Sequence, residues 1–213
     1  MHFDLAAIGE TNAYKLLIST VVPRPIALVT TVDASGRVNA APFSFFNAVS
    51  SRPPVVVLGI NGEGPGGSPH KDTEQNIRDS GEFVVNLVDE VIAERMNICA
   101  VDFPTGTGEL NIADLKPLDS VGVKAPRIAE APVAFECKRI TGLSLGGQST
   151  LEVGRVIHIH IRDDLVDLEK FYVQTAKMGL VGRMHGRGWY ARTTDLFEMD
   201  RITYSEWKDG RRR

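Results

Sequence analysis

Apolar residues along this chain fall in short runs that are separated by turn residues. IALVTTV (26–32) is followed by the turn DASG (33–36), where Asp33 and Ser35 bond locally and Gly36 supplies a positive φ. RVNAAPFSFFNAVS (37–50) then returns, and the pattern predicts an antiparallel β-hairpin. PPVVVLGI (53–60) predicts a third strand that is buried on both faces, because it is apolar throughout.

Later segments alternate between helical and strand patterns. DTEQNIRDSG (72–81) predicts a helix that Asp72 or Thr73 caps and Gly81 ends; Asp72 and Gln75 have capping-box spacing. Two more strands are predicted around a glycine-rich turn in 132–164. The remaining predicted elements are a helix or arm at 5–17, a strand at 82–88, helices at 89–100 and 167–178, a loop at 103–120 and a mixed end segment at 186–199.

Strands joined by hairpins dominate this pattern, which predicts a mainly β protein, a barrel with peripheral helices. The length of 213 residues fits one domain, residues 1–213. A formal net charge of −3 gives no basic field for nucleic acid, and the terminal Arg211–Arg213 run is interpreted as a frayed end. Two cysteines without metal spacing, no secretion signal and no membrane-length apolar run indicate a cytoplasmic protein.

Three motifs in the sequence do not have the context that their chemistry needs. Gly62, Gly64 and Gly67 spell G-x-G-x-x-G, but a dinucleotide fold needs parallel strands and a helix that begins within the glycines. Lys71 lacks the flanking residues of a P-loop. The G-x-S-x-G at 142–146 precedes a strand rather than a helix, which favours a hairpin turn over a hydrolase elbow.

His158 and His160 share one face of a predicted strand. Two histidines make half of a metal site, but the sequence gives no third ligand at suitable spacing. We therefore expect a polar strand face and no metal.

Two stretches carry groups that suit a phosphorylated ligand. SFFNAVSS (44–51) alternates small polar and apolar side chains, so that one face offers hydrogen bonds. Lys71, Asp72 and Thr73 stand where a helix begins, and free amides and a partial positive charge at that position attract anions. Asp72 opposes an anion unless its carboxylate is engaged as a helix cap.

The order and spacing of several segments resemble the flavin reductase-like, FMN-binding split β-barrel family. The resemblance rests on residues 23–60, HKDTEQNI, GEFVVNLV, APRIAEAPVAFECKRI and LEVGRVIHIHI, and so covers most of the chain. It implies a split barrel with Greek-key strand order and a homodimer with FMN near the interface. It also implies FMN as cofactor, NADH or NADPH as co-substrate, and a monooxygenase or electron-transfer partner.

The resemblance also implies roles for individual residues, with no side chain acting as catalytic acid or base. Ser44, Phe45, Phe46 and Asn47 would line the flavin ring, and Ser50 and Ser51 would bond the ribityl chain or phosphate. Lys71, Asp72 and Thr73 would close on the phosphate, with Arg24 as a further anion contact. The second subunit would contribute from the segment around Arg183, His185 and Tyr190.

The implied activity is hydride transfer from NAD(P)H to flavin, in which the flavin carries the chemistry. Two alternatives remain open at this point. One is a non-enzymatic, flavoredoxin-like FMN electron carrier that serves a protein partner. The other is a flavin oxidase of a small substrate.

Overall fold

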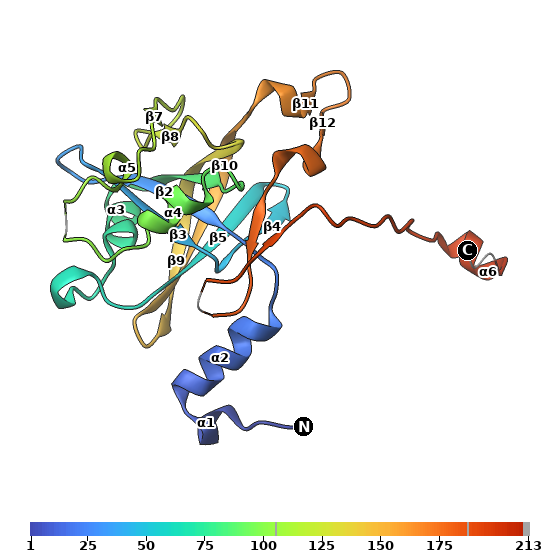
Figure 1. Cartoon of the computed structure of the whole chain (residues 1–213), viewed down its shortest axis with the longest axis horizontal. Coiled ribbons are helices and arrows are strands. Elements are labelled where there is room, and N and C mark those ends of the chain that lie inside the picture. Colours follow the sequence, from blue (N-terminus) through green and yellow to red (C-terminus); the bar gives the residue numbers. More distant parts are fainter. Residues whose placement is uncertain (105, 187, 211–213) are drawn as a thin grey trace.

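A curved antiparallel sheet of seven strands forms the body of the protein in the computed structural model, which describes residues 1–104, 106–186 and 188–210 (Figure 1). The strand order across the sheet is β3-β2-β6-β9-β10-β5-β4. Its strands are β2 (Ala27–Val32), β3 (Val38–Phe43), β4 (Phe46–Ser51), β5 (Pro54–Asn61), β6 (Glu82–Leu87), β9 (Val133–Gly146) and β10 (Ser149–Ile161).

The two edges of this sheet are β3 and β4, which are consecutive in the chain. Only Ser44 and Phe45 separate the end of β3 from the start of β4. Since consecutive Cα atoms are 3.8 Å apart, Phe43 and Phe46 lie within about 11 Å of each other. The sheet must therefore curl until its edges meet at this end, which makes it a barrel that is split elsewhere.

Apolar side chains fill the inside of the barrel and cover part of its outside. Ala27 and Val29 of β2 pack in one buried cluster, with Phe83 and Leu58, while Leu28 packs in another. Side chains alternate along a strand, so β2 is buried on both faces. The prediction that β5 is buried on both faces holds in part, because its positions alternate between buried and half-buried residues.

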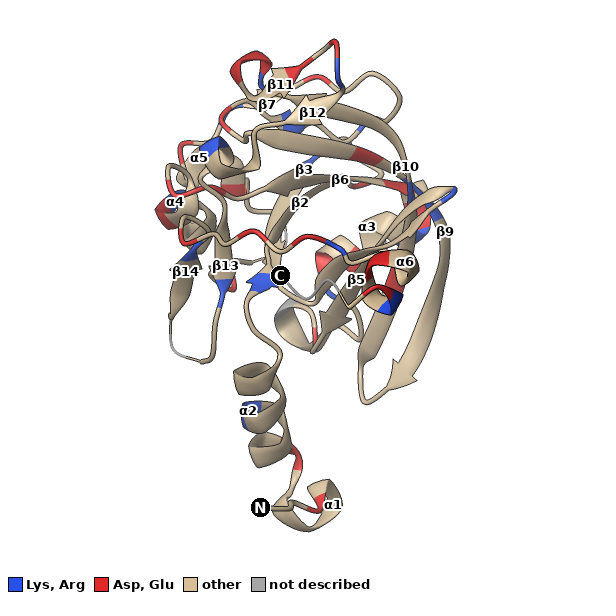
Figure 2. Cartoon of the chain, turned by 90° about the vertical axis from the view of Figure 1, so that its right-hand side faces the viewer, with Lys and Arg blue, Asp and Glu red and all other residues tan. Residues whose placement is uncertain are grey.

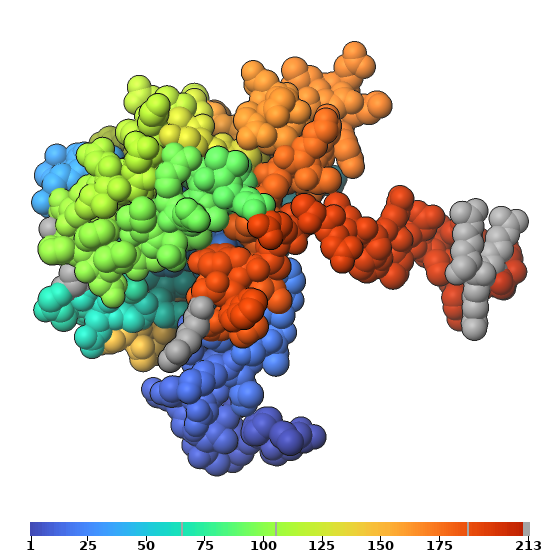
Figure 3. Space-filling view, in the orientation of Figure 1, coloured from blue at the N-terminus to red at the C-terminus, as the bar shows by residue number. Residues whose placement is uncertain are grey.

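Smaller elements surround the sheet. Figures 1 and 3 show α2 projecting from the body as an arm and the last residues leading away to α6. Figure 2 shows basic and acidic residues interspersed over the chain. The helices are α1 (Leu5–Ile8), α2 (Glu10–Thr20), α3 (Asp72–Ser80), α4 (Ala93–Ile98), α5 (Glu109–Ile112) and α6 (Tyr204–Lys208), with 3₁₀ turns η1 (Pro65–Gly67), η2 (Asp163–Leu165) and η3 (Thr175–Met178). The short strands are β1 (Arg24–Pro25), β7 (Pro117–Leu118), β8 (Arg127–Ile128), β11 (Val166–Asp167), β12 (Tyr172–Val173), β13 (Val181–Arg183) and β14 (Tyr190–Arg192).

The predicted hairpin is confirmed, with the turn chemistry expected from its sequence. The Asp33 carboxylate accepts hydrogen bonds from the Ser35 and Arg37 amides at 2.8 and 2.9 Å, and Gly36 has a φ of 85°. The predicted single return strand over 37–50 is wrong. It is two strands, β3 and β4, because the chain leaves one edge of the sheet at Ser44 and joins the other edge at Phe46.

The predicted helix at 167–178 is wrong. Asp167 at the end of β11 accepts hydrogen bonds from the amides of Glu169 and Lys170, and this local turn competes with helix formation. Phe171 then has a φ of 50°, and the chain returns as β12 before η3. The helix predicted at 89–100 is shorter than expected and spans only Ala93–Ile98.

Helix α3 begins and ends where the sequence predicts, but its N-cap differs. Lys71 is the N-cap, with extended backbone and no capping bond from its side chain, so neither Asp72 nor Thr73 caps the helix. Gly81 ends α3 in the left-handed conformation, as expected.

Two of the three motifs set aside in the sequence, the glycine fingerprint and the G-x-S-x-G, have the contexts predicted for them. β5, which precedes the glycines, pairs antiparallel with β4 and β10, unlike a strand of a dinucleotide fold. The segment 142–146 ends β9 and leads directly into β10.

No helix in the described part of the chain has the length and apolar composition needed to cross a bilayer. The Arg211–Arg213 end lies outside the described residues.

Candidate functional site

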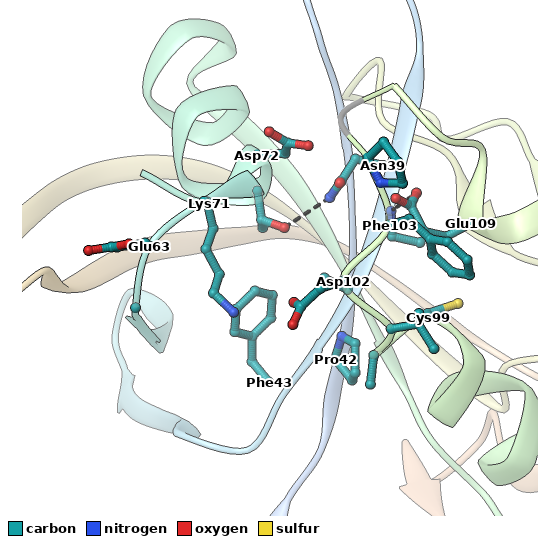
Figure 4. Close-up of a pocket in the computed structure, with 18 of the residues that line it drawn as sticks. Asn39, Pro42, Phe43, Glu63, Lys71, Asp72, Cys99, Asp102, Phe103 and Glu109 are labelled. Carbon is teal, nitrogen blue, oxygen red and sulfur yellow. Dashed lines mark hydrogen bonds between the residues drawn. The ribbon is translucent and has the colours of Figure 1, made fainter. Parts of the chain in front are cut away.

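A pocket of about 680 Å³ opens between β3, the loop after β5, the start of α3 and the connection from α4 to α5 (Figure 4). Its volume lies in the range that is usual for small-molecule sites, about 300–1,000 Å³. Its lining includes Asn39, Pro42, Phe43, Glu63, Lys71, Asp72, Thr73, Cys99, Asp102, Phe103 and Glu109.

The start of α3 supplies the cationic part of the pocket. In Figure 4 the Lys71 side chain runs from the helix start toward Phe43, while the Asp72 carboxylate lies on the other side of that start. Lys71 is the one lysine or arginine among the described lining residues. The first turn of a helix also presents free backbone amides and a partial positive charge. A ligand phosphate is therefore best placed here.

Thr73 is fixed beneath this helix start. It is 2% exposed, and its Oγ1 accepts a hydrogen bond of 2.9 Å from Nδ2 of Asn39 on β3. This bond ties α3 to the barrel across the pocket (Figure 4).

The β3 side of the pocket and the connection between α4 and α5 are apolar and aromatic. Phe43 belongs to the core inside the barrel and is 8% exposed, and Pro42 precedes it on β3. Phe103, which is half-buried, contributes a second ring from the connection between α4 and α5. Planar rings and a proline favour a flat, apolar ligand group at this end.

Glu109 places a buried carboxyl group on the pocket wall. Its Oε2 accepts a hydrogen bond of 3.2 Å from the Ala40 amide. Burial raises the pKa of Glu109, hydrogen bonds from backbone amides oppose that shift, and the charge of Asp72 adds to it. Burial, with a smaller effect of Glu109, raises the pKa of Cys99 to about 11, so this thiol stays protonated and unreactive near neutral pH.

Replacing Glu109 with glutamine is expected to make stability less sensitive to pH. The pKa of Glu109 is raised in the folded protein, so the stability it contributes is full at low pH and is lost as pH rises through that pKa. Relative to wild type, Glu109→Gln should therefore gain free energy of unfolding as pH rises from the ordinary pKa of glutamate, about 4.3, through the raised pKa of the folded protein. Urea denaturation of the flavin-free proteins measures this. Glu94→Gln, at an exposed position on α4, is the control, and a difference that is constant across pH would contradict the assignment.

Arg24, Ser44 and Phe45 form a second group, outside the lining of this pocket. The Arg24 guanidinium is 6% exposed and donates to the carbonyl oxygens of Ile18, Val21 and Met184 at 2.7, 2.7 and 2.8 Å. It also lies 3.4 Å from Ser44 Oγ and over the Phe45 ring. Burial lowers its pKa. These contacts tie the end of α2 to β13 and occupy much of this cation.

The other predicted site residues are dispersed. Phe46 packs in the core inside the barrel and, unlike Phe43, does not line the pocket. Asn47, Ser50 and Ser51 are exposed on β4 and do not line the pocket. His185 stacks on Trp189 with ring centroids 5.7 Å apart, near β13. The structure therefore brings Lys71, Asp72 and Thr73 together in the pocket and leaves the rest of the predicted set outside it.

Several pocket residues were missed in the sequence. Asn39 and Phe43 lie on β3, where alternation separates two faces without showing which face meets a ligand. Phe103 and Glu109 lie in the stretch 103–120 that the sequence predicts as loop, and Asp102 directly precedes it. Packing of that connection against β3 brings them to the site, and no local sequence pattern signals it.

His158 and His160 are on β10, as expected for the predicted strand. His160 Nε2 lies 2.6 Å from Oε1 of Glu136, which is fully buried and also accepts hydrogen bonds from the Val121 and Gly122 amides. This histidine therefore stabilises a buried carboxylate that anchors a loop. Within the described ranges, no group of three histidine, cysteine or acidic residues has metal-binding geometry.

The chain matches one family model and resembles solved structures over nearly its whole length. The family model for the flavin reductase like domain matches residues 19–177. The structure resembles 2-nitrobenzoate 2-nitroreductase NbaA of Pseudomonas fluorescens, with a TM-score of 0.87 and 35% identity over 96% of this chain and 98% of that one. It also resembles nitrilotriacetate monooxygenase component B of Bacillus cereus, with a TM-score of 0.87 and 31% identity over 93% and 98% of the two chains.

A third structural match concerns the fold alone. A protein with a split barrel domain from Shewanella frigidimarina is 20% identical, with a TM-score of 0.78 over 96% of this chain and 99% of that one. Together with the sheet order, this likeness confirms the predicted split β-barrel.

Proposed function

The chain belongs to the flavin reductase like family of flavin-binding oxidoreductases, and from this premise we propose that it binds FMN and passes a hydride from NADH or NADPH to flavin. The observation that carries the proposal is the pocket. It joins a helix start with Lys71 to an apolar end with Phe43 and Phe103.

The start of α3 and the aromatic part of the pocket fit the two ends of FMN. The α3 amides, Lys71 and Thr73 suit the phosphate, and the aromatic end suits the flavin ring. A micromolar site needs about 8 kcal/mol of binding free energy. Several charge-assisted hydrogen bonds of about 1.5–3 kcal/mol each, with burial of the ring, reach that value before association costs are subtracted.

Once bound, flavin supplies the redox chemistry, because it accepts a hydride and passes electrons on. The residues of this chain bind and orient it. Lys71 and the α3 amides fix the phosphate end, and the Asn39–Thr73 hydrogen bond keeps that end in register with β3. Phe43 and Phe103 hold the ring end and exclude water from one side of it.

The carboxyl groups on the pocket wall oppose a second anion. Glu63, Asp72, Asp102 and Glu109 line the pocket with Lys71. Each charged acid raises the free energy of an anionic ligand nearby. We infer that the flavin phosphate is held chiefly at α3, where Lys71 and the helix amides offset these acids.

Ser44, Phe45, Asn47, Ser50, Ser51 and His185 stay in the proposal only as FMN contacts made at a homodimer interface. Arg24 and Phe46 are buried within this chain and stay in it as neighbours that position Ser44 and Phe45. Asn47, Ser50 and Ser51 are exposed, and Arg183 Nη1 is buried without a hydrogen-bond partner among the described residues. Exposed polar groups on β4 and an unsatisfied guanidinium favour a partner surface. A homodimer, one domain over residues 1–213 and a cytoplasmic location remain parts of the proposal.

A second function is supported by one comparison. The Bacillus cereus relative is a monooxygenase component B, which suggests that this chain hands electrons to a protein partner. The non-enzymatic FMN carrier and the flavin oxidase of a small substrate remain alternatives.

Steady-state oxidation of NADH and NADPH, with and without added FMN, tests the proposal. The expected result is oxidation that depends on both the protein and flavin. FMN binding with no such oxidation, but with reduction by a reduced protein partner, would favour the electron carrier. If titration shows no FMN binding, all three flavin functions are excluded.

A further inference from the structure

The glycine-rich loop 62–71 joins β5 to α3 and forms one rim of the pocket (Figure 1). Glu63, Gly64 and Lys71 are among its residues that line the pocket. The loop folds back on itself, because the Gly64 amide donates to the Ser68 carbonyl oxygen at 2.8 Å. The affinity of the pocket for a phosphate therefore depends on where this loop delivers Lys71.

A buried carboxylate holds the residue that precedes Lys71. Glu74, in the first turn of α3, is 2% exposed, and its Oε1 lies 3.0 Å from Nδ1 of His70. The same oxygen accepts hydrogen bonds from Arg78 Nη1 at 3.3 Å and from Thr150 Oγ1 at 2.9 Å. Burying a carboxylate costs free energy unless such partners are present. Glu74 thus ties the loop to α3 and to β10 at one point.

The polar neighbours of the His70 ring fix its tautomer and its orientation. Arg78 Nη1 lies 3.1 Å from Nε2 of His70. A guanidinium only donates hydrogen bonds, and a carboxylate only accepts them. Neutral His70 satisfies both neighbours when Nδ1 carries the proton and donates to Glu74, while Nε2 accepts from Arg78. The ring is therefore held at both nitrogens.

The backbone of His70 is confined as well. A Cβ atom on Gly64 would lie 2.0 Å from the His70 carbonyl oxygen, which is too close for any side chain. Gly64 therefore lets the loop close against the peptide that joins His70 to Lys71. This close approach of two backbone segments gives one glycine of the G-x-G-x-x-G stretch a role in packing.

We propose that His70, anchored on Glu74, is a positioning residue for the flavin phosphate. The inference rests on the proposed function, which places that phosphate at Lys71 and the start of α3. His70 does not line the pocket, so it acts through the adjacent Lys71 and not on the ligand. Because the ring and the carbonyl of His70 are held, the lysine side chain leaves the loop at a fixed point and runs toward Phe43 (Figure 4). Less conformational freedom of Lys71 is then lost when the phosphate binds.

Fluorescence titration of the flavin-free full chain with FMN and with riboflavin tests this role. His70→Ala should weaken FMN binding about tenfold, because the ligand must then order Lys71, and riboflavin binding less than about twofold. His70→Asn should keep FMN affinity within about threefold of wild type, since Nδ2 of asparagine, like Nδ1 of histidine, is bonded to Cγ and can donate to Glu74. His158→Ala, at an exposed position on β10 outside the pocket, is the matched control and should leave both affinities unchanged.

A double-mutant cycle with Lys71→Ala separates positioning from a general structural role. If His70 acts through Lys71, adding His70→Ala to Lys71→Ala should weaken FMN binding less than about twofold further. A residue that only supports the fold would weaken FMN and riboflavin binding alike, and its full effect would persist in the double variant. Urea denaturation of each variant measures any loss of stability separately.

Several results would overturn the inference and leave flavin binding itself intact. They are an unchanged FMN affinity in His70→Ala, equal losses for FMN and riboflavin, and full additivity with Lys71→Ala. An FMN affinity in His70→Asn as low as in His70→Ala would overturn the anchoring on Glu74. An unchanged FMN affinity in Lys71→Ala would also overturn it, because His70 would have no phosphate-binding charge to position. If wild type binds no FMN, the proposed function itself fails.

Discussion

Replacing Lys71 with alanine is expected to weaken FMN binding by about 10- to 100-fold. Lys71 is the one lysine or arginine among the described residues that line the pocket, and it stands at the start of α3. A charge-assisted hydrogen bond to phosphate contributes about 1.5–3 kcal/mol, which corresponds to that range. Fluorescence titration of the flavin-free protein measures the effect directly.

Riboflavin is the ligand control for this substitution, because it carries the same ring and no phosphate. Its affinity should change less than about twofold in Lys71→Ala, since the lost interaction is with phosphate. Lys177→Ala, at an exposed position outside the pocket, should leave FMN binding unchanged. Equal losses for FMN and riboflavin would remove Lys71 from the phosphate role.

Replacing Phe83 with alanine is expected to lower the free energy of unfolding by about 3–5 kcal/mol. Phe83 is fully buried on β6 inside the barrel. Its ring occupies the space where Gly154 on β10 has no side chain, and a Cβ there would lie 2.4 Å from the ring. Truncation therefore leaves a cavity that neighbouring strands cannot close without moving.

Urea denaturation of wild type and Phe83→Ala measures this loss. Phe197→Ala is the matched control, because Phe197 is 84% exposed and its truncation should change stability by less than about 0.5 kcal/mol. If Phe83→Ala lowered the free energy of unfolding as little as Phe197→Ala, the barrel interior would not be packed around this ring.

The parts of the fold that local chemistry determines could be predicted from the sequence. The β2–β3 turn forms because Asp33 bonds the amides that follow it and Gly36 tolerates a positive φ. Helix α3 ends at Gly81 for the same kind of reason. The prediction of a single return strand fails at Ser44, where the chain passes from one edge of the sheet to the other. Barrel closure causes this crossing, and closure is a property of the whole sheet.

The candidate site could be predicted only in part. Lys71, Asp72 and Thr73 line the pocket because a helix start has its own anion-binding chemistry, which the sequence reveals. Phe103 and Glu109 reach the pocket only through packing of the connection between α4 and α5 on β3. SFFNAVSS has the polar and apolar alternation of a binding strand, yet Phe46 faces the core and Asn47 lies outside the pocket.

The acidic groups give the pocket a local negative charge that the formal net charge of the whole chain does not reveal. Glu109, in particular, is buried in the pocket wall next to Phe103 (Figure 4), and its pKa is affected by the charge of Asp72 at the helix start. Protonation of this carboxyl as pH falls removes a negative charge from the site. FMN affinity should then rise toward low pH, in the same direction as the stability effect of Glu109.

The absorption spectrum of the purified protein, recorded with FMN under anaerobic conditions before and after NADH or NADPH is added, tests the central claim most directly. The account predicts protein-bound flavin absorbance in the visible range that is bleached by at least one of the two nicotinamide nucleotides. A spectrum that shows no bound flavin after incubation with FMN, or bound flavin that neither nucleotide bleaches, would contradict it.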